Sequence, residues 1–364
     1  MTVRLSSLRA SHVAIPIVAL LLFVGGLATH PSDAVLLALG VVLALAVLEA
    51  VHHAEVVAHR VGEPLGSLVL AVAVTIIEVG MIVVLMASHP DTTAGLARDT
   101  VFSAAMIACN GIVGGALVLS TFRGRIARFN PEGIGGAVAA IAVLATLCLV
   151  LPNYTLTTKG PYFSAAQLIF AAVASLTIYV AFVSAQTIRH RDLFLEEAVA
   201  APAAAEPAED RPTRRAARIS LILLAVSLVA VVGLAELTTP LIESAVNDAG
   251  LPSSVVAVSI ALLVLLPEAI SALRASRRGD VQKSLNLAYG SVMASIGLTI
   301  PVIAIIALAF DYRLALGLPN AAIVLLALTV AVSTLTIVQG RAILLQGVAH
   351  LAIFGAFIVL AFNP

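Results

Sequence analysis

Charged residues are scarce in this chain of 364 residues. Lysine, arginine, aspartate and glutamate make up 11% of it, whereas a soluble domain averages about 25%. No stretch is both long and polar enough to form a separate soluble enzyme domain, which argues against a soluble enzyme. The formal net charge is zero, so a nucleic acid as partner has no electrostatic support. Cysteine is also rare: Cys109 and Cys148 both lie in apolar runs, where we expect small packing side chains rather than a disulfide or a metal pair.

Long hydrophobic runs dominate instead, and hydrophobic residues make up 61% of the chain. Repeated apolar runs of about 18 residues or more predict transmembrane helices. We therefore expect an all-α polytopic membrane protein surrounded by the lipid bilayer. The first run follows Arg4 and Arg9 without a clear small-residue cleavage site, so we interpret it as a retained span. Eleven spans are predicted, at about 13–29, 34–58, 65–88, 100–121, 134–152, 163–188, 218–239, 253–275, 284–309, 314–337 and 342–362.

The basic residues predict the orientation of these spans. With the N-terminus in the cytoplasm, 17 of the 20 lysines and arginines fall in the inner segments. Only Arg98, Lys159 and Arg313 fall in the outer ones. Cytoplasmic loops carry such an excess of positive charge, so we expect a cytoplasmic N-terminus and an external C-terminus.

A short pattern occurs twice, 188 positions apart. The stretch Glu55–Pro64 and the stretch Glu243–Pro252 share the order Glu, three residues, two polar residues, one residue, Gly, one residue, Pro. The predicted topology puts the two copies at opposite membrane faces, which is typical of an inverted repeat. An Ala/Pro/Glu-rich segment between the halves is expected to be a flexible tether. The expected organisation is a leading helix in 1–33, a first five-helix repeat in 34–188, a cytoplasmic linker in 189–217 and a second five-helix repeat in 218–364.

Two glutamates lie in the middle of apolar spans. A carboxylate at that depth costs roughly 2.5–3.5 kcal/mol on insertion scales, and such residues usually mark an ion or proton path. Glu78 follows Pro64 by 14 residues and Glu268 follows Pro252 by 16, or ~21 Å and ~24 Å of helix from opposite faces. The two carboxylates are therefore predicted to meet near the midplane. No lysine or arginine lies in the middle of a span to pair with either of them, which disfavours a purely structural role.

Paired carboxylates suit both hard cations and protons, because oxygen ligands bind the former and mutual repulsion favours the latter. A site that takes one or the other, but not both, is the physical basis of antiport. Polar side chains near the same level are predicted to add ligands. For the hydroxyl residues, packing between helices is an equal alternative, whereas a site role is favoured for the amide. These candidates are Thr75, Asn110, Ser291 and Ser295.

The second span carries a polar stripe on one helical arc. Histidine titrates near neutrality, so the stripe is either a pH-responsive gate or proton path, or simply a polar cytoplasmic helix end. A zinc protease is excluded because its motif needs Glu directly after the first His. Glu236 and Glu243 are expected to line an outer vestibule. The stripe consists of Glu49, His52, Glu55 and His59.

Two segments resemble the signature regions of ChaA-type calcium:proton antiporters, in the cation/proton exchanger branch of the calcium:cation antiporter superfamily. They are VVAHRVGEPLGSLVLAVAVTIIEV and LLPEAISALRASRRGDVQKSLNLAYGSVMASIGLTIP. The resemblance implies an eleven-helix inverted-repeat fold in the bacterial inner membrane. Glu78 and Glu268 match the paired cation-binding glutamates of the family, and Gly290-Ser291 matches its Gly-Ser pair.

The chain departs from the broader Gly-Asn-x-x-Glu pattern of the exchangers in both copies. Val74-Thr75 precedes Glu78, and Val264-Leu265 precedes Glu268. The two missing amides remove oxygen ligands and make a monovalent cation more plausible than the family pattern alone implies.

The sequence thus predicts a secondary antiporter that exchanges cytoplasmic Ca²⁺, Na⁺ or K⁺ for external protons. A Na⁺ or K⁺:proton antiporter without Ca²⁺ transport is the first alternative. A passive cation channel and a membrane-embedded enzyme are weaker ones. No cofactor and no catalytic residue are predicted, and the oligomeric state is left open.

Overall fold

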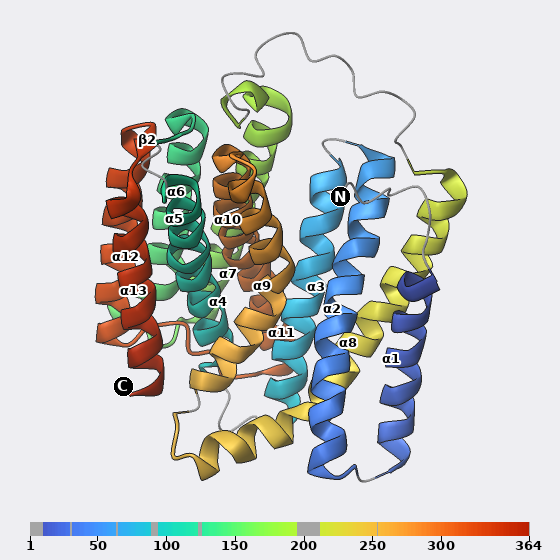
Figure 1. Ribbon diagram of the computed structural model, residues 1–364. Coiled ribbons are helices and arrows are strands. Elements are labelled where there is room, and N and C mark those ends of the chain that lie inside the picture. The colour runs from blue at the N-terminus through green and yellow to red at the C-terminus, as the bar shows by residue number, and fades with distance from the viewer. Residues whose placement is uncertain are drawn as a thin grey trace. The chain divides into compact units, whose positions relative to one another are not determined.

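The computed structural model describes residues 10–29, 31–62, 65–88, 94–122, 126–194, 212–252 and 254–363. Within these ranges, eleven helices are long and apolar enough to cross a membrane. The predicted all-α polytopic architecture and its span count are therefore confirmed (Figure 1). Most of the predicted linker (residues 195–211), Pro64 of the repeated pattern, and Arg4 and Arg9 before the first span lie outside the described residues.

The first half contains six spans. They are α1 (Ala10–Ala28), α2 (Asp33–Val61), α3 (Leu65–Ser88), a fourth span made of α4 (Leu96–Met106), the π-helical η1 (Ile107–Ile112) and α5 (Val113–Thr121), a fifth made of α6 (Pro131–Ala145), η2 (Thr146–Val150) and η3 (Leu151–Asn153), and a sixth made of α7 (Ala165–Ser184) and η4 (Ala185–Arg189). The short strand β1 (Ala127–Arg128) precedes α6, and η5 (Arg191–Phe194) follows η4.

The second half contains five spans. They are α8 (Arg214–Asp248), α9 (Ser254–Arg277), a ninth span made of α10 (Val281–Ala294), the π-helical η8 (Ser295–Thr299) and α11 (Ile300–Phe310), then α12 (Asn320–Val338) and α13 (Leu344–Phe362). Strand β2 (Arg341–Ala342) precedes α13 and pairs antiparallel with β1.

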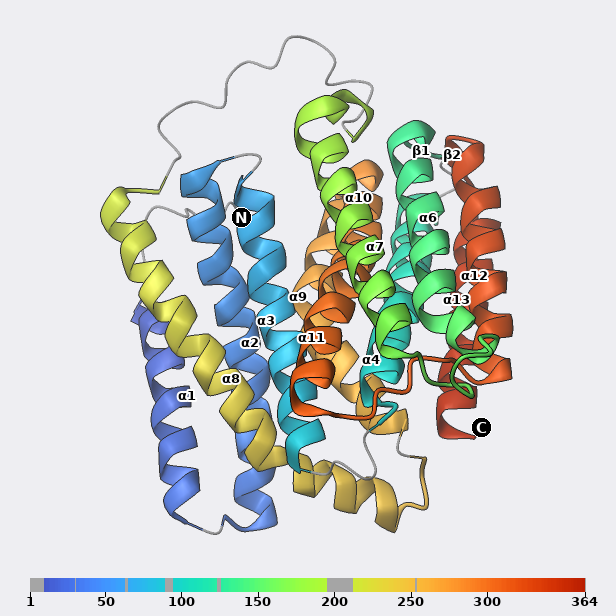
Figure 2. The ribbon, with the colours of Figure 1, turned by 180° about the vertical axis from the view of Figure 1, so that it is seen from behind.

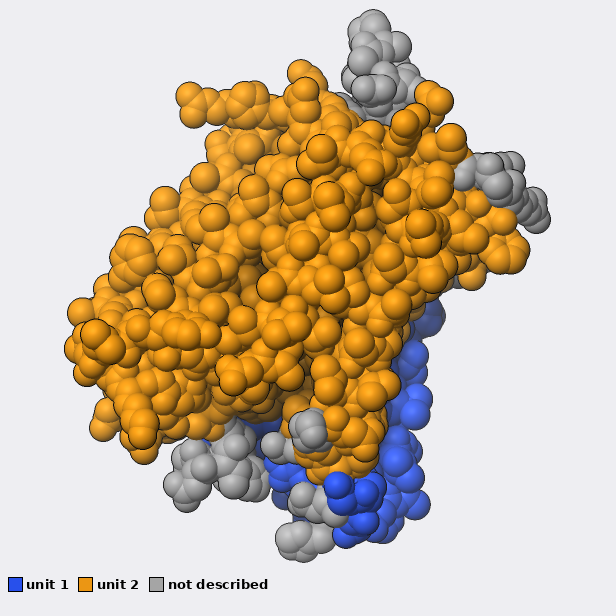
Figure 3. Space-filling view, turned by 90° about the vertical axis from the view of Figure 1, so that its left-hand side faces the viewer, with its two compact units in different colours: residues 1–88, 202–250 blue, residues 89–201, 251–364 orange. Residues whose placement is uncertain are grey.

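The chain divides into two packing units, coloured separately in Figure 3. Unit 1 comprises Met1–Ser88 and Pro202–Gly250, and unit 2 comprises His89–Ala201 and Leu251–Pro364. Unit 1 thus holds α1, α2, α3 and α8, and the other helices belong to unit 2. Each sequence repeat contributes helices to both units.

In unit 1, α8 packs against α1, α2 and α3, crossing them obliquely (Figure 2). Glycines allow the helices to approach closely, because no side chain separates the backbones. A Cβ on Gly80 of α3 would lie 2.6 Å from Val232 Cγ2 of α8, and one on Gly26 of α1 would lie 2.6 Å from Leu237 Cδ1. The α8 helix continues past Pro240 to Asp248, so its predicted end at 239 was nine residues early.

In unit 2, the fourth and ninth spans run in opposite directions. Ala315 N–H donates to Ala94 O (2.9 Å) and joins the chain after α11 to the chain before α4. At the other end, Asn130 N–H after α5 donates to Gln282 Oε1 at the start of α10 (2.8 Å). Two helices that meet end to start at both ends are antiparallel, as an inverted repeat requires.

The two spans share a further feature at equivalent positions. Each is interrupted by a π-helical turn, which begins at Ile107 in one span and at Ser295 in the other. These residues lie 188 positions apart, the same spacing as the repeated pattern. Gly62 and Gly250, also 188 positions apart, both have positive φ, at 77° and 65°.

The predicted start of the tenth span, at 314, was wrong. Residues 314–319 are apolar but not helical, and α12 begins at Asn320. Backbone groups of this loop are satisfied by residues far along the chain instead: Gly317 N–H donates to Pro161 O (3.0 Å) and Leu318 N–H to Leu149 O (2.8 Å). Buried non-helical backbone is tolerated in such a protein when protein groups satisfy it.

Candidate functional site

The predicted site residues are divided between the two units. Unit 1 holds Glu78 with Thr75 on α3, the polar stripe on α2, and Glu236 and Glu243 on α8. Unit 2 holds Glu268 on α9, Asn110 on η1, Ser291 on α10 and Ser295 at the start of η8. The pairing of the two glutamates, which belong to different units, stays a prediction.

Glu78 and Thr75 lie one turn apart on the same face of α3. Both side chains are buried, with 3% of Glu78 and 7% of Thr75 exposed. The apolar residues of α3 form a membrane-length helix around this carboxyl group, which therefore faces protein rather than lipid. Ionisable residues within membrane spans are expected to do so when they serve a function.

The side chains of the polar stripe on α2 differ in exposure and in their partners along the helix. Its inner part is joined to α1 by His12, whose Nδ1 lies 2.9 Å from Glu49 Oε2. The His12 ring stacks on His52 with 4.1 Å between ring centroids, and His53 Nε2 lies 2.9 Å from His12 O. At the helix end His59 is exposed. Glu55, between them, is half-buried.

Sequence reasoning missed His12, because a helical wheel of α2 alone shows no partner from α1. It left His53 out of the stripe because that residue lies outside the arc. Within the described residues no three His, Cys, Asp or Glu side chains are arranged to hold a metal ion. The two acidic residues of α8 differ from each other, since Glu236 is exposed and Glu243 half-buried.

In unit 2, Glu268 and Asn110 lie at nearly the same depth on neighbouring helices. The spans that carry them, α9 and α4–α5, pack together along their length. Near their ends Ser276 Oγ lies 2.6 Å from Ser120 Oγ. Glu268 is eight residues before Ser276 and Asn110 ten before Ser120, or ~12 Å and ~15 Å along parallel helices. The half-buried Glu268 and the buried Asn110 are therefore within about one turn of each other in depth.

Asn110 is fully buried and belongs to a polar network that joins η1 to α12 and α13. Its Nδ2 donates to Thr329 Oγ1 (2.9 Å), and its Oδ1 lies 3.2 Å from His350 Nδ1. His350 Nε2 lies 3.2 Å from Thr336 Oγ1. Sequence reasoning missed Thr329, Thr336 and His350, although a single histidine in the middle of the last apolar span is a visible signal.

The serines of the ninth span lie at different depths. Ser284 Oγ donates to Ala272 O (2.7 Å) and fixes the antiparallel register of α10 against α9. Measured from this contact, Glu268 lies four residues from Ala272 along α9, or ~6 Å. Ser291 lies seven residues from Ser284 along α10, or ~10 Å. Ser295 lies a further turn away, where it is buried. Of the two predicted serines, Ser291 is therefore closer to the level of Glu268.

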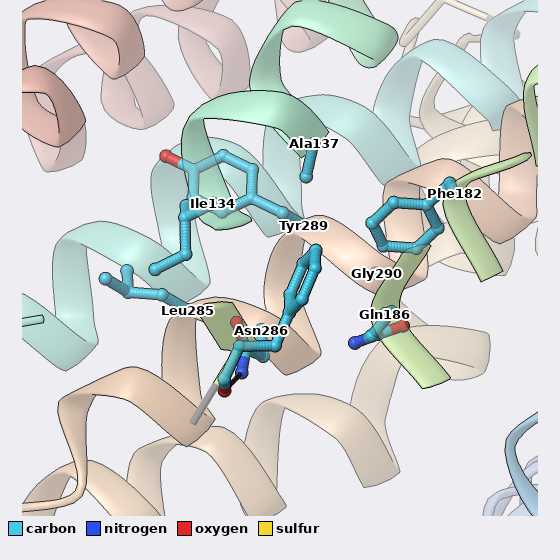
Figure 4. A pocket seen from close by; sticks show the side chains of 9 residues that line it. Ile134, Ala137, Phe182, Gln186, Leu285, Asn286, Tyr289 and Gly290 are labelled. Carbon is cyan, nitrogen blue, oxygen red and sulfur yellow. Dashed lines mark hydrogen bonds between the residues drawn. The ribbon is translucent and has the colours of Figure 1, made fainter. Parts of the chain in front are cut away.

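A narrow pocket lies beside Gly290 (Figure 4). Its lining is mostly apolar, and the polar side chains labelled in Figure 4 are those of Gln186, Asn286 and Tyr289. The Asn286 amide is already engaged, because Nδ2 donates to Phe194 O (2.7 Å) and Oδ1 accepts from Gln282 Nε2 (3.3 Å). The pocket is therefore a poor ion site.

Comparison with known proteins identifies the family of the chain. The profile of the family described as sodium/calcium exchanger protein matches residues 32–188 and 219–363. A candidate ionic transporter of Sinorhizobium fredii, y4hA, is 44% identical over 88% of this chain and 86% of its own. The sodium-potassium/proton antiporter ChaA of Escherichia coli is 34% identical over 86% of this chain and 84% of its own.

Solved structures show the same fold at low identity. The structure of native YfkE superposes with a TM-score of 0.70 at 15% identity, covering 97% of this chain and 100% of that one. The H⁺/Ca²⁺ exchanger CAX gives a TM-score of 0.70 at 16% identity, covering 96% of this chain and 87% of that one. The chain is therefore a multi-pass membrane transport protein. It belongs to the sodium/calcium exchanger protein family and is a cation antiporter of the ChaA type, a cation/proton exchanger.

Proposed function

We propose that this antiporter exchanges cytoplasmic Na⁺ or K⁺ for external protons at a site shared by Glu78 and Glu268. Na⁺ and K⁺ are the first candidates because the relative that is 34% identical is described as a sodium-potassium/proton antiporter. The amides absent before both glutamates favour the same ions, since fewer oxygens suit a lower charge. Ca²⁺ is the second candidate because two carboxylates can neutralise a divalent ion.

The observation that carries this proposal is the position of the two carboxyl groups. Glu78 is buried in the middle of a membrane-length helix, and Glu268 shares its depth with the buried amide of Asn110. The energetic cost of a carboxylate in a membrane is offset when a cation or a proton neutralises it. Because a cation and a proton compete for the same carboxyl groups, the cation flux is coupled to the proton flux.

The transport cycle follows from this competition. Protons that enter from outside neutralise the glutamates and release the cation outward. Deprotonation at the cytoplasmic face then restores two carboxylates that attract the next cation. Thr75, Asn110, Ser291 and Ser295 add neutral oxygens to the site. The second and seventh spans act as gating helices, and their extensive mutual packing as α2 and α8 in unit 1 suits a joint movement.

The protein is proposed to lie in the bacterial inner membrane with its N-terminus in the cytoplasm and its C-terminus outside. The distribution of basic residues, 17 inside and 3 outside, supports this orientation. In the same topology Glu236 and Glu243 line the outer vestibule, and the stripe from Glu49 to His59 lies toward the cytoplasm.

Everted vesicles that contain a pH-sensitive dye test this function. Addition of Na⁺ or K⁺ to energised vesicles is expected to discharge the pH gradient in a saturable manner, with Ca²⁺ tested in parallel. Cation uptake without opposing proton movement would identify a passive channel instead. No response to any of the three ions would refute the proposal.

A further inference from the structure

We propose that His350 is a positioning residue of the cation site, which orients the amide of Asn110 on the π-helical turn of the fourth span. The inference rests on the proposed function, because it takes the amide oxygen of Asn110 as a neutral ligand of the cation in that site. It adds His350, Thr329 and Thr336 as residues that set the strength of cation binding without contacting the ion.

The hydrogen-bond directions form one consistent chain. With the Asn110 amide oriented as in the structure, Oδ1 is an acceptor, so His350 must donate from Nδ1. The neutral ring then has an acceptor at Nε2, which receives the hydroxyl proton of Thr336 at 3.2 Å. On the other side, Asn110 Nδ2 donates to Thr329 Oγ1, and the Thr329 hydroxyl donates to Met106 Sδ at 3.5 Å. Each of these donor groups in the hydrogen-bond network thus has an acceptor.

Packing keeps these groups together. The side chains of Asn110 and His350 are completely buried, and Thr329 and Thr336 are 3% and 1% exposed. Gly114, one turn after Asn110, brings α13 close, since a Cβ there would lie 3.0 Å from both Gly347 O and His350 Cβ. The imidazole therefore has little freedom to leave the amide.

The network also selects the group that remains for an ion. A carboxamide oxygen has two lone pairs, and the His350 N–H uses one of them. The other is left for a ligand at the depth of Glu268. Asn110 lies on a π-helical turn, and such turns are frequent at functional sites. The orientation of its amide decides whether a cation at this level contacts the amide oxygen or the amide nitrogen. Loss of His350 frees the amide to rotate and weakens cation binding more than turnover.

A plain structural role for the cluster makes a different prediction, namely lower stability with unchanged affinity in the surviving protein. The test therefore compares Na⁺ and K⁺ exchange by the full-length protein in proteoliposomes, with KM and maximal rate measured separately. The variants are His350→Leu, His350→Gln, Thr336→Val and Thr334→Val. Thr334 lies on the same helix as Thr336 and has an exposed side chain whose hydroxyl donates to Val330 O, so it is the matched control.

His350→Leu is expected to raise KM about 10-fold and to change the maximal rate less than about 2-fold, the effect of losing one buried hydrogen bond. His350→Gln, whose amide N–H can donate to Asn110, should return KM to within about 3-fold of the wild type. Thr336→Val should raise KM about 3-fold by removing the donor to Nε2. Thr334→Val should match the wild type.

An unchanged KM in folded His350→Leu would overturn the inference, and so would an equal loss of rate in His350→Leu and His350→Gln. If His350→Leu does not fold, Thr336→Val decides, and an unchanged KM in that variant refutes the positioning role. The wild-type reaction separates this failure from that of the proposed function. Exchange by the wild type with unaffected variants refutes only the role of His350, whereas no exchange by the wild type refutes the proposed function itself.

Discussion

His12 and Glu49 lie 2.9 Å apart, atom Nδ1 to atom Oε2, and this contact ties the first helix of the chain to the second. Glu49 is only 9% exposed. A buried carboxyl group that loses its partner retains the cost of its desolvation, which ranges from about 1 to 3 kcal/mol. His12→Ala is therefore expected to lower the melting temperature in detergent.

A double-mutant cycle with Glu49→Gln separates this contact from general damage. Residues in direct contact couple by about 0.5–3 kcal/mol, so the double variant should be less destabilised than the sum of the singles. His190→Ala, which removes an exposed histidine, is the control. Strictly additive losses would show that the pair contributes nothing specific.

Gly80 is expected to tolerate no side chain, because its helix touches α8 just after Glu78. A Cβ there would lie 2.6 Å from Val232 Cγ2. Overpacking of this kind typically costs about 1–3 kcal/mol. Gly80→Ala should therefore reduce thermal stability, and Val232→Ala in the same protein should restore much of it. Gly136→Ala, in a helix with nothing within 4 Å of the new Cβ, should be neutral or stabilising. Failure of the second substitution to rescue the first would contradict the proposed clash.

The two repeat-related glycines, Gly62 and Gly250, should be sensitive for another reason. Neither has a neighbour within 4 Å of a new Cβ, but both have positive φ. An L-residue at positive φ costs about 1–3 kcal/mol, and the ψ of 170° at Gly62 lies in a region that is essentially restricted to glycine. Losses of stability are therefore expected for Gly62→Ala and Gly250→Ala, measured by thermal unfolding. A pair of neutral alanine variants would count against this conformation.

Ion selectivity is expected to respond to the amides that the chain lacks. Thr75→Asn and Leu265→Asn place an amide three residues before each glutamate, as in the exchanger pattern. Added oxygen ligands favour a divalent ion over a monovalent one. The double variant should gain Ca²⁺ exchange relative to Na⁺ in a vesicle assay with both ions. An unaltered ratio in a well-folded double variant would argue against a ligand role for these positions.

The spans were predictable because hydropathy is a local property. Each helix is a run of apolar residues, and ten of the eleven predicted starts fall within four residues of the structure. The start of α12 was not predicted correctly, because Leu316 and Leu318 lie in a buried loop and are as apolar as the residues of the helix that follows. Hydrogen bonds to residues far along the chain, such as Pro161 and Leu149, hold that loop in its non-helical form.

The site was predictable in part. Glu78, Glu268 and Asn110 are polar residues in apolar runs, which a single sequence reveals. The partners of Asn110 come from residues 219 and 240 positions away, so only the fold brings Thr329 and His350 to it. The same holds for His12 and the stripe on α2. The π-helical turns at Ile107 and Ser295 have no sequence signal that we recognised, although they obey the repeat spacing.

The central claim is that Glu78 and Glu268 serve one exchange site, and steady-state exchange by the single and double glutamine variants tests it most directly. Glu132→Gln, the same chemical change at an exposed glutamate, is the control, and insertion and folding are checked for every variant. One shared site predicts that Glu78→Gln and Glu268→Gln each abolish exchange and that the double variant is no worse than either single one. Partial activity in both single variants, with further loss in the double variant, would mean two independent sites and would contradict the account.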